Sequence, residues 1–406
     1  MDNTGEKAIC KAKVHKIIYA AGAAGVVLLN VASWRSVRFS DWYIKNIFPV
    51  WLNTYARLTS KIPFSVGEIM LILAVAVTVF GIGFWTVNLI CRRRYKKAVK
   101  RFGSFYAWTV LAVCYVMTLN CFILYHTSSF SEKYLADRLE AEMMVAGVSD
   151  RAVVQAYARQ DAAAVERAYT KRELAVLRDY IVRKCNELEK VIPHDDSGSA
   201  YYDGDLVEAS RRAMMKLGED YDQLSGFYVT PKYLSFSDFF SQQYIMGYYF
   251  PFSMEANINS MMYITNVAPT VCHELAHTKG FIYEDDANMI GYLACINSDD
   301  LFLQYCGYLS VLSYVNNDFL DSIGKNQSVY KSHVRISDGV ADDNIFLTRE
   351  TWQTVEKIAI VKTSTVKKVS DTLMDTTLKL NGVEEGMLQY NNVVGLLLTY
   401  YDGELY

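Results

Sequence analysis

This sequence of 406 residues contains little proline and no closely spaced cysteines. It also lacks a large excess of charge of either sign. The net charge is −3, from 41 basic and 44 acidic residues, so the composition gives no indication of a nucleic-acid partner. Eight scattered cysteines without a C-x-x-C pair exclude a disulfide-dense mini-protein and disfavour a zinc site made of thiolates. Six prolines in the whole chain suit a compact helical body.

Formal charge is absent from three long stretches near the N-terminus, residues 17–34, 69–91 and 102–125. About 20 apolar residues in a helix cross the hydrocarbon core of a bilayer, so each stretch is predicted to be a transmembrane helix. The first stretch is the shortest and could instead be the core of a signal peptide, but no convincing cleavage site follows it. We therefore predict that residues 1–126 form an anchor in the lipid bilayer.

Lysine and arginine predict the orientation of this anchor. Four lysines precede the first stretch and seven basic residues lie within 92–101, whereas the segment 35–65 carries five. Because basic residues are enriched on the cytoplasmic side, eleven against five predicts a cytoplasmic N-terminus in a multi-pass protein of the cell membrane. Three crossings then place everything after His126 outside the cytoplasm. Residues 41–58 mix aromatics with isolated charges, which predicts either an amphipathic interfacial element or a simple extracytoplasmic loop.

Residues 127–406 are predicted to form one mainly α-helical domain with a small β ribbon. Strand-like alternation is scarce, and Gln243–Asn259 is its best case, as an edge strand or an irregular hairpin. Cys295 and Cys306 could pair, although buried free thiols fit their spacing equally well. Helical spacing of apolar residues indicates helices near 131–147, 163–190, 205–219, 268–279, 285–297, 301–315, 349–380 and 384–401.

One motif carries chemistry: His273-Glu274-Leu275-Ala276-His277 reads H-E-x-x-H. Positions i and i+4 of a helix share a face, so both imidazoles can bind one metal ion, and two imidazoles with a carboxylate suit Zn²⁺ best. Glu274 follows the first ligand and is placed to take a proton from a zinc-bound water. The alternative interpretation is a pair of core histidines held by ordinary hydrogen bonds.

A third, oxygen ligand is expected from the acidic cluster that follows Gly280 and opens the next helix. Glu284 is the first choice, with Asp286 as the main alternative and Asp285 as a further one. The same carboxylates could be present only because a helix N-terminus favours negative charge.

Two further roles are expected near the motif. The span Met246–Asn259 precedes the motif helix by about ten residues, and extended substrates of zinc peptidases often pair with an edge strand beside the metal. The span could equally be a purely structural ribbon. A phenol could stabilise an oxyanion, but spacing does not choose among the possible tyrosines, which are Tyr248, Tyr249, Tyr308 and Tyr390.

At these residues the sequence resembles an uncharacterised family of bacterial integral-membrane proteins with a domain of unknown function. The resemblance rests on Pro63–Glu68 (PFSVGE), Gly247–Asn259 (GYYFPFSMEANIN), the block from His273 to Cys295, and Tyr390–Tyr401. It implies a membrane-anchored, zincin-like metallopeptidase. The sequence is also similar to membrane zinc peptidases that have E-x-x-x-D after H-E-x-x-H. Glu284 and Asn288 would occupy the positions of that glutamate and aspartate here. Asp286 stands where the family usually has Glu, which favours Glu284 as the ligand.

Two functions are therefore expected to compete. The first is a membrane-anchored zinc metallopeptidase that hydrolyses extracytoplasmic proteins or peptides, with His273, His277 and Glu284 as ligands and Glu274 as general base. The second is a non-catalytic membrane sensor or assembly protein, in which a fourth protein ligand closes a structural metal site. A transporter is disfavoured, because three spans without charge clusters offer no transport pathway.

Overall fold

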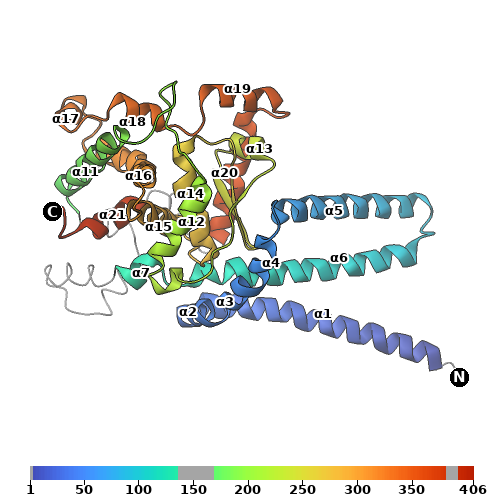
Figure 1. Cartoon of the computed structure of the whole chain (residues 1–406). Coiled ribbons are helices and arrows are strands. Elements are labelled where there is room, and N and C mark those ends of the chain that lie inside the picture. Colours follow the sequence, from blue (N-terminus) through green and yellow to red (C-terminus); the bar gives the residue numbers. More distant parts are fainter. Residues whose placement is uncertain (1–2, 136–168, 381–391) are drawn as a thin grey trace.

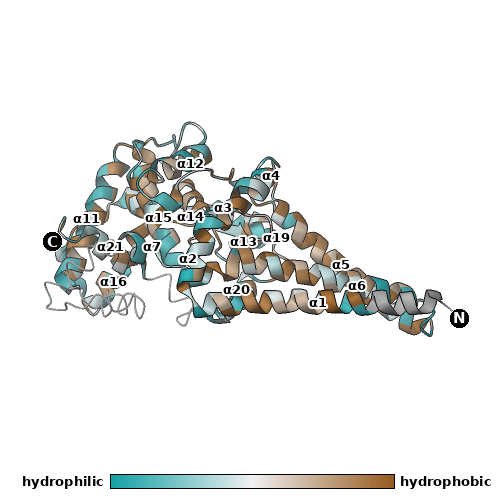
Figure 2. Ribbon diagram, turned by 90° about the horizontal axis from the view of Figure 1, so that it is seen from below, coloured by the Kyte–Doolittle hydropathy of each residue, from teal (hydrophilic) through white to brown (hydrophobic). Residues whose placement is uncertain are grey.

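The structure is a computed structural model that describes residues 3–135, 169–380 and 392–406 (Figure 1). Three helical segments within this part are long and apolar enough to cross a membrane: Lys13–Arg35, Val66–Ile90 and Lys96–His126. They coincide with the three uncharged stretches. They belong to α1 (Asn3–Arg35), to α5 (Val66–Ile90) and to α6 (Lys96–Met117) with its continuation. All three project from one side of the molecule, and Figure 2 shows apolar residues along them.

The third of these segments is no longer a regular α-helix where it meets the C-terminal domain. After α6 the chain makes a π-helix, Thr118–Phe122, and then a 3₁₀ turn, Leu124–His126. A capping box at Ser129, in which the Ser129 backbone N–H donates to the Glu132 carboxylate and the Ser129 hydroxyl accepts from the Glu132 N–H, then begins the short helix α7 (Phe130–Tyr134). Single π-turns inside helices occur frequently at functional sites, and this one lies where the candidate span meets the domain.

The segment between the first two candidate spans is helical and belongs to the domain core. It forms α2 (Val37–Asn46), α3 (Phe48–Trp51), a π-helix (Leu52–Ala56) and α4 (Arg57–Ser60). Tyr43, Phe48 and Leu52 are buried in the same hydrophobic cluster as the helices that follow residue 169. The amphipathic pattern of residues 41–58 is therefore explained in part by packing on protein. The predicted division after residue 126 does not separate two cores.

The domain itself is a packed body of helices with a small sheet. At its centre α14 (Val267–Thr278) packs against α12 (Leu206–Leu217) and α15 (Glu284–Ile296), and α16 (Leu301–Ser322) lies between α15 and α11 (Lys171–Glu189). The remaining helices surround this group: α13 (Ser237–Gln242), α17 (Gln327–Ser332), α18 (Asp338–Asp343), α19 (Arg349–Ile358), α20 (Thr363–Leu380) and α21 (Val393–Tyr401).

The sheet has three strands in the order β1 (Lys232–Tyr233), β3 (Glu255–Ile258), β2 (Gly247–Phe250). β2 and β3 form an antiparallel hairpin in the register Gly247↔Ile258 to Phe250↔Glu255, and β1 pairs with β3 in parallel. The hairpin lies within the predicted span Gln243–Asn259. The two-residue strand β1 was not predicted, because so short a strand carries no alternation pattern. Both hairpin strands contact α14, so the sheet lies beside the motif helix.

Most predicted helices appear in the described residues, with three clear differences. The helix predicted over 131–147 ends at Tyr134 in α7, and Leu135 follows it with φ −112° and ψ 1°. The helix predicted over 349–380 is divided into α19 and α20, and the connection is extended at Ala359, with φ −62° and ψ 120°. The helix predicted to end at residue 315 continues to Ser322. Parts of three predictions, at 136–147, 163–168 and 384–391, lie outside the described residues. Cys295 and Cys306 are buried free thiols.

Candidate metal centre

Two helices joined by a tight turn bring the candidate ligands together. Asn266 precedes α14, which has Pro269 in its first turn and ends at Thr278. Gly280 then adopts φ +91°, where a side chain would be strained, and a Cβ there would lie 2.2 Å from Cδ1 of Ile44. The chain reverses, and α15 begins at Glu284. The turn thus places the first residue of α15 against the last turns of α14.

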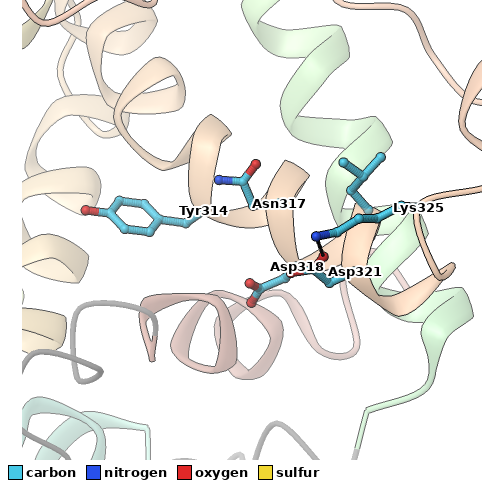
Figure 3. Close-up of a pocket in the computed structure, with 6 residues that line it drawn as sticks. Tyr314, Asn317, Asp318, Asp321 and Lys325 are labelled. Carbon is cyan, nitrogen blue, oxygen red and sulfur yellow. Dashed lines mark ion pairs between the residues drawn. The ribbon is translucent and has the colours of Figure 1, made fainter. Parts of the chain in front are cut away.

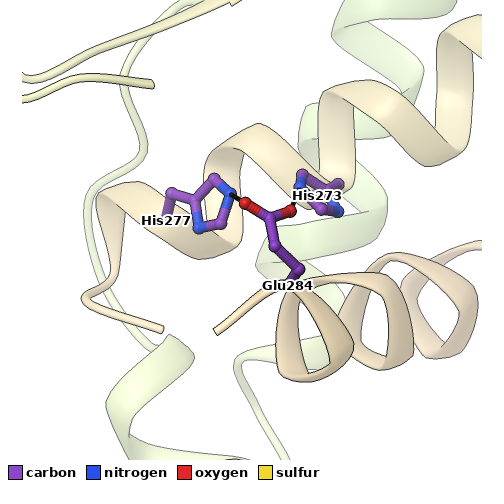
Figure 4. A group of neighbouring side chains, drawn as sticks. All are labelled: His273, His277 and Glu284. Atoms are coloured by element: carbon purple, nitrogen blue, oxygen red, sulfur yellow. Dashed lines mark ion pairs between the residues drawn. The ribbon is translucent and has the colours of Figure 1, made fainter. Parts of the chain in front are cut away.

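The side chains of His273, His277 and Glu284 converge on one point (Figure 4). Nε2 of His273 lies 3.1 Å from Oε2 of Glu284, and Nε2 of His277 lies 3.9 Å from Oε1. All three ligand atoms lie within 4.8 Å of one another. A tetrahedral zinc ion with bonds of about 2.1 Å holds its ligand atoms roughly 3.4 Å apart, so the donor set and its spacing fit zinc.

The outer nitrogen of each imidazole is held by an oxygen. Nδ1 of His277 donates to the carbonyl oxygen of Phe281 (2.7 Å), which can only accept, so Nε2 of the neutral ring carries the lone pair. Nδ1 of His273 lies 2.9 Å from Oδ1 of Asn288, one helical turn after Glu284. Such hydrogen bonds fix the orientation and tautomer of metal-binding histidines. The turn at Gly280 therefore supplies both the third candidate ligand and the acceptor for His277.

The two histidines have opposite electrostatic surroundings. Burial and the neighbouring His273 lower the pKa of His277 to about 4, so this ring is neutral at physiological pH. Burial also disfavours charge on His273, but Glu284 and Glu274 outweigh burial and raise its pKa. The carboxylate field thus favours a positive charge between the imidazoles, which is the charge that a divalent cation would supply.

Glu274 is buried beside this group, with 4% of its surface exposed. Its Oε2 has no hydrogen-bond partner among the described residues. Burial raises the pKa of Glu274 to about 8, with His273 opposing the shift and Glu284 adding to it. Strand β2 covers the other oxygen, because a Cβ on Gly247 would lie 2.4 Å from Oε1 of Glu274. Gly247 therefore leaves the space that the carboxylate occupies.

The other carboxylates of the acidic cluster do not join the group. Asp286 is buried, and its Oδ2 accepts a hydrogen bond from the backbone N–H of Phe130 (2.9 Å) at the start of α7. Asp285 Oδ1 accepts from the N–H of Asp286. Glu284 is thus the member of the cluster that faces both histidines, and Asp286 instead fastens α15 to α7.

The four tyrosines considered from the sequence lie in different places. Tyr308 packs against Tyr180 and Tyr292, and Tyr390 lies outside the described residues. The hydroxyl of Tyr249 donates to the backbone oxygen of Asn120. Tyr248 is close enough to Glu274 and Glu284 for their charges, after desolvation, to raise the pKa of its phenol, which therefore keeps its proton. Its ring packs against Phe240 and Phe250, and among the three described tyrosines of this group it is the one whose phenol pKa is raised by the charges of both Glu274 and Glu284.

A single side chain, that of Tyr249, separates the candidate metal centre from the third candidate membrane span. The ring centroid of Tyr249 is 6.2 Å from that of His277, and its hydroxyl donates to Asn120 O (3.2 Å) in the π-helix that follows α6. Asn120 Nδ2 in turn donates to the Pro251 carbonyl (3.0 Å). This contact was not predicted, since no motif marks an asparagine at the end of an apolar stretch.

A second set of contacts fastens the hairpin to the start of α5. Buried Glu255 accepts hydrogen bonds from the backbone N–H groups of Val66 (3.2 Å) and Gly67 (2.8 Å) and forms an ion pair with Lys232. A Cβ on Gly67 would lie 2.4 Å from Cγ of Phe250, so the first turn of α5 packs directly on β2. The candidate metal centre, the hairpin, the start of α5 and the segment after α6 are therefore packed against one another.

A polar depression at the end of α16 is separate from this chemistry. Figure 3 shows its lining, in which Lys325 pairs with Asp321 at 3.1 Å. Burial and Asp321 raise the pKa of Asp318 to about 6. Neither motif histidine lines this depression, and its residues belong to a largely solvated helix end.

Comparison with known proteins places the chain in a family but assigns no activity. The chain matches the family described as "Protein of unknown function (DUF3810)" over residues 43–398, and it belongs to that family. The match confirms the resemblance to an uncharacterised family. No curated protein and no solved structure matches the chain.

Proposed function

We propose that this member of the DUF3810 family is a membrane-anchored, zinc-dependent metallopeptidase that hydrolyses extracytoplasmic proteins or peptides. One observation carries the proposal: two imidazole Nε2 atoms and one carboxylate converge, while both Nδ1 atoms are held by oxygens. In this proposal His273, His277 and Glu284 bind the zinc and Glu274 is the general base. The lipid bilayer and a polypeptide substrate are the partners.

The chemistry divides between the metal and the chain. A zinc ion held by these ligands would polarise a carbonyl group and lower the pKa of water toward ~7. Glu274 accepts the proton of the attacking water on its unpartnered Oε2 and later delivers that proton to the leaving amine. In this proposal Tyr248, whose phenol keeps its proton, donates a hydrogen bond to the developing oxyanion.

Strand β2 offers a place for an extended substrate. The N–H of Asn259 donates to the oxygen of Met246, so alternate residues of β2, beginning with Met246, direct their backbone groups toward β3. The backbone groups of Gly247 and Tyr249 then face the free edge, because β2 is the outer strand of this sheet. A substrate chain that pairs with them would run beside Glu274, which contacts Gly247.

The structural-metal alternative receives less support. A closed structural site needs four protein ligands. Among the described residues, the group that could hold an ion contains only His273, His277 and Glu284. An open fourth position favours catalysis. We also propose that the N-terminus is cytoplasmic and that the candidate centre faces the extracytoplasmic side. The reason is that basic residues are concentrated before the first apolar stretch and between the second and third.

The proposal is tested with Glu274→Gln in the full-length protein. This variant keeps the size of the side chain but has no carboxylate to take a proton, so we expect unchanged zinc content by elemental analysis and no proteolysis. Substrates are sought by comparing new protein N-termini in cells that carry the wild type or the variant. Glu208→Gln, which changes a surface ion pair, is the matched control. A Glu274→Gln protein that cleaves as fast as the wild type would refute the role of this residue.

A further inference from the structure

A group of exposed apolar side chains lies outside the three candidate spans. Phe236 and Phe239, at α13, are each 50% exposed, and Ile358, Ile360 and Val361, at the end of α19 and in the connection to α20, are 50%, 99% and 49% exposed. We call these five residues the apolar rim. Single exposed apolar residues are ordinary on a protein surface, but a contiguous set marks an interaction site.

Specific hydrogen bonds hold the two halves of the apolar rim together. The buried side chain of Gln242, the last residue of α13, donates through Nε2 to the Val361 carbonyl (2.9 Å) and lies 3.2 Å from Oγ1 of Thr363. α13 also contacts both α19 and α20. The α19–α20 connection is therefore fixed to α13. The almost fully exposed Ile360 lies next to the residue whose carbonyl accepts the Gln242 hydrogen bond.

A second set of hydrogen bonds fixes the height of the apolar rim relative to α5. The backbone N–H groups of Ser235 and Phe236 donate to the two carboxylate oxygens of Glu68, at 2.9 and 3.0 Å. Glu68 lies in the first turn of α5, and the exposed apolar residues 69–73 of the candidate span follow it directly. Phe236 thus lies where the hydrocarbon-facing surface of α5 begins. Figure 1 shows α13 and α19 on the side of the domain from which α5 and α6 extend.

The sequence around Ile360 suits the boundary between lipid and water. Residues 357–362 read Lys-Ile-Ala-Ile-Val-Lys, and both lysines are exposed. Apolar side chains flanked by basic ones insert into the headgroup region, where lysine is attracted to anionic lipids. Phe236 and Phe239, on the helix to which this connection is hydrogen-bonded, supply further apolar area.

We propose that the apolar rim is a second membrane contact, which inserts into the outer interface of the same bilayer that α5 crosses. Continuity with the exposed surface of α5 identifies a lipid surface as the occupant. The contact holds the domain against the membrane at a point beyond the three helices. β2, on which the first turn of α5 packs, is then kept close to the bilayer surface.

The test uses an environment-sensitive NBD fluorophore on Ile360→Cys in the full-length protein. Cys10, Cys91, Cys114 and Cys121 are replaced by alanine, and the four buried cysteines of the domain are kept. The protein is reconstituted in vesicles of phosphatidylethanolamine and phosphatidylglycerol, with or without doxyl-labelled phosphatidylcholine as quencher. Val329→Cys on α17 is the matched control, because Val329 is an exposed apolar residue (39%) on the side of the domain away from α5 in Figure 1.

We expect a blue shift of the emission and quenching by the doxyl lipid at position 360, and neither effect at position 329. Water-like emission at position 360 in vesicles overturns the proposal. A blue shift without lipid quenching also overturns it, because a protein partner or a second copy of the chain would then cover the apolar rim. An unchanged melting temperature of each labelled variant shows that the fold is retained. No outcome depends on peptidase activity.

Discussion

The strongest stability prediction concerns the carboxylate that joins the hairpin to α5. Glu255 is 1% exposed and receives hydrogen bonds from Val66 N–H, Gly67 N–H and the Ser253 hydroxyl as well as from the Lys232 ammonium. Glu255→Gln keeps the shape of the side chain but removes its charge. Lys232, whose side chain is 3% exposed, would then face a neutral amide in place of a carboxylate, with the Thr59 carbonyl as its other close acceptor.

The expected loss of stability follows from the burial of both partners. Breaking a buried ion pair by changing one partner costs about 3–5 kcal/mol, because the other charge stays buried without compensation. A surface pair costs about 0–1 kcal/mol. Glu208 pairs with Arg211 at 2.8 Å, and their side chains are 35% and 25% exposed, so Glu208→Gln is the matched control. At about 2–4 °C per kcal/mol for a domain of 150–250 residues, Glu255→Gln should lower Tm by on the order of 10 °C.

The assay is thermal unfolding of the full-length protein in detergent, followed by circular dichroism. A double-mutant cycle with Lys232→Met separates the charge effect from the lost hydrogen bonds to α5, because the double variant no longer buries an unpaired ammonium. We expect the double variant to be less destabilised than the sum of the two single variants. Equal losses for Glu255→Gln and Glu208→Gln, or strict additivity in the cycle, would show that the buried pair does not carry the stabilisation inferred from it.

Three further predictions follow from single contacts. Gly247→Ala should move Glu274, because a Cβ would lie 2.4 Å from Oε1 of Glu274. We expect proteolysis to fall by about 100-fold with unchanged zinc content. Full activity of this variant would contradict the contact. Asn288→Ala removes the acceptor for His273 and should weaken zinc binding by about 10–100-fold in a chelator competition, whereas equal affinity would exclude a role in orienting the ring. The pKa of Asp318 is raised from 3.8 to about 6, so its stabilising contribution is present below pH 3.8 and is lost as pH rises through 6. Asp318→Asn should therefore be more stable than the wild type at pH 8, by about 1 kcal/mol after discounting for solvent exposure, but not at pH 4. A difference in unfolding free energy that does not change with pH would refute that linkage.

The parts of the structure that the sequence predicts are those encoded by local patterns. The three apolar helices can be recognised in the sequence, because a helix that crosses lipid needs about 20 residues with few or no charges. The convergence of His273 with His277 follows from helical periodicity. The same periodicity places the two alternative carboxylate ligands, Glu284 and Asp286, on different faces of their helix. Successive residues turn by 100°, so Asn288 lies close to the face of Glu284, whereas Asp286 points about 200° away. This angle could have favoured Glu284 over Asp286 without coordinates.

Features that depend on distant contacts were not predictable. The residues 37–60 were assigned with the anchor, yet Phe48 and Leu52 are buried in the domain core, because an amphipathic pattern does not distinguish a lipid surface from a protein surface. The end of α19 at Ile358 is another example. Residues 349–380 have a continuous helical pattern, but the chain is extended at Ala359 and Gln242 donates a hydrogen bond to the carbonyl of Val361. Both outcomes depend on residues more than a hundred positions away.

The segments that carry the family resemblance are far apart in sequence, but they make one chain of contacts. Gly67, in the first segment, lies against Phe250, in the second. Gly247, at the start of that second segment, lies against Glu274 in the third. In both places a glycine is required because a methyl group would overlap the neighbouring side chain. A shift of α5 would therefore press on Phe250 of β2, and a shift of β2 would press through Gly247 on the carboxylate proposed as the general base. If the centre is catalytic, its geometry depends on how α5 is seated, and the membrane anchor is part of the active-site scaffold.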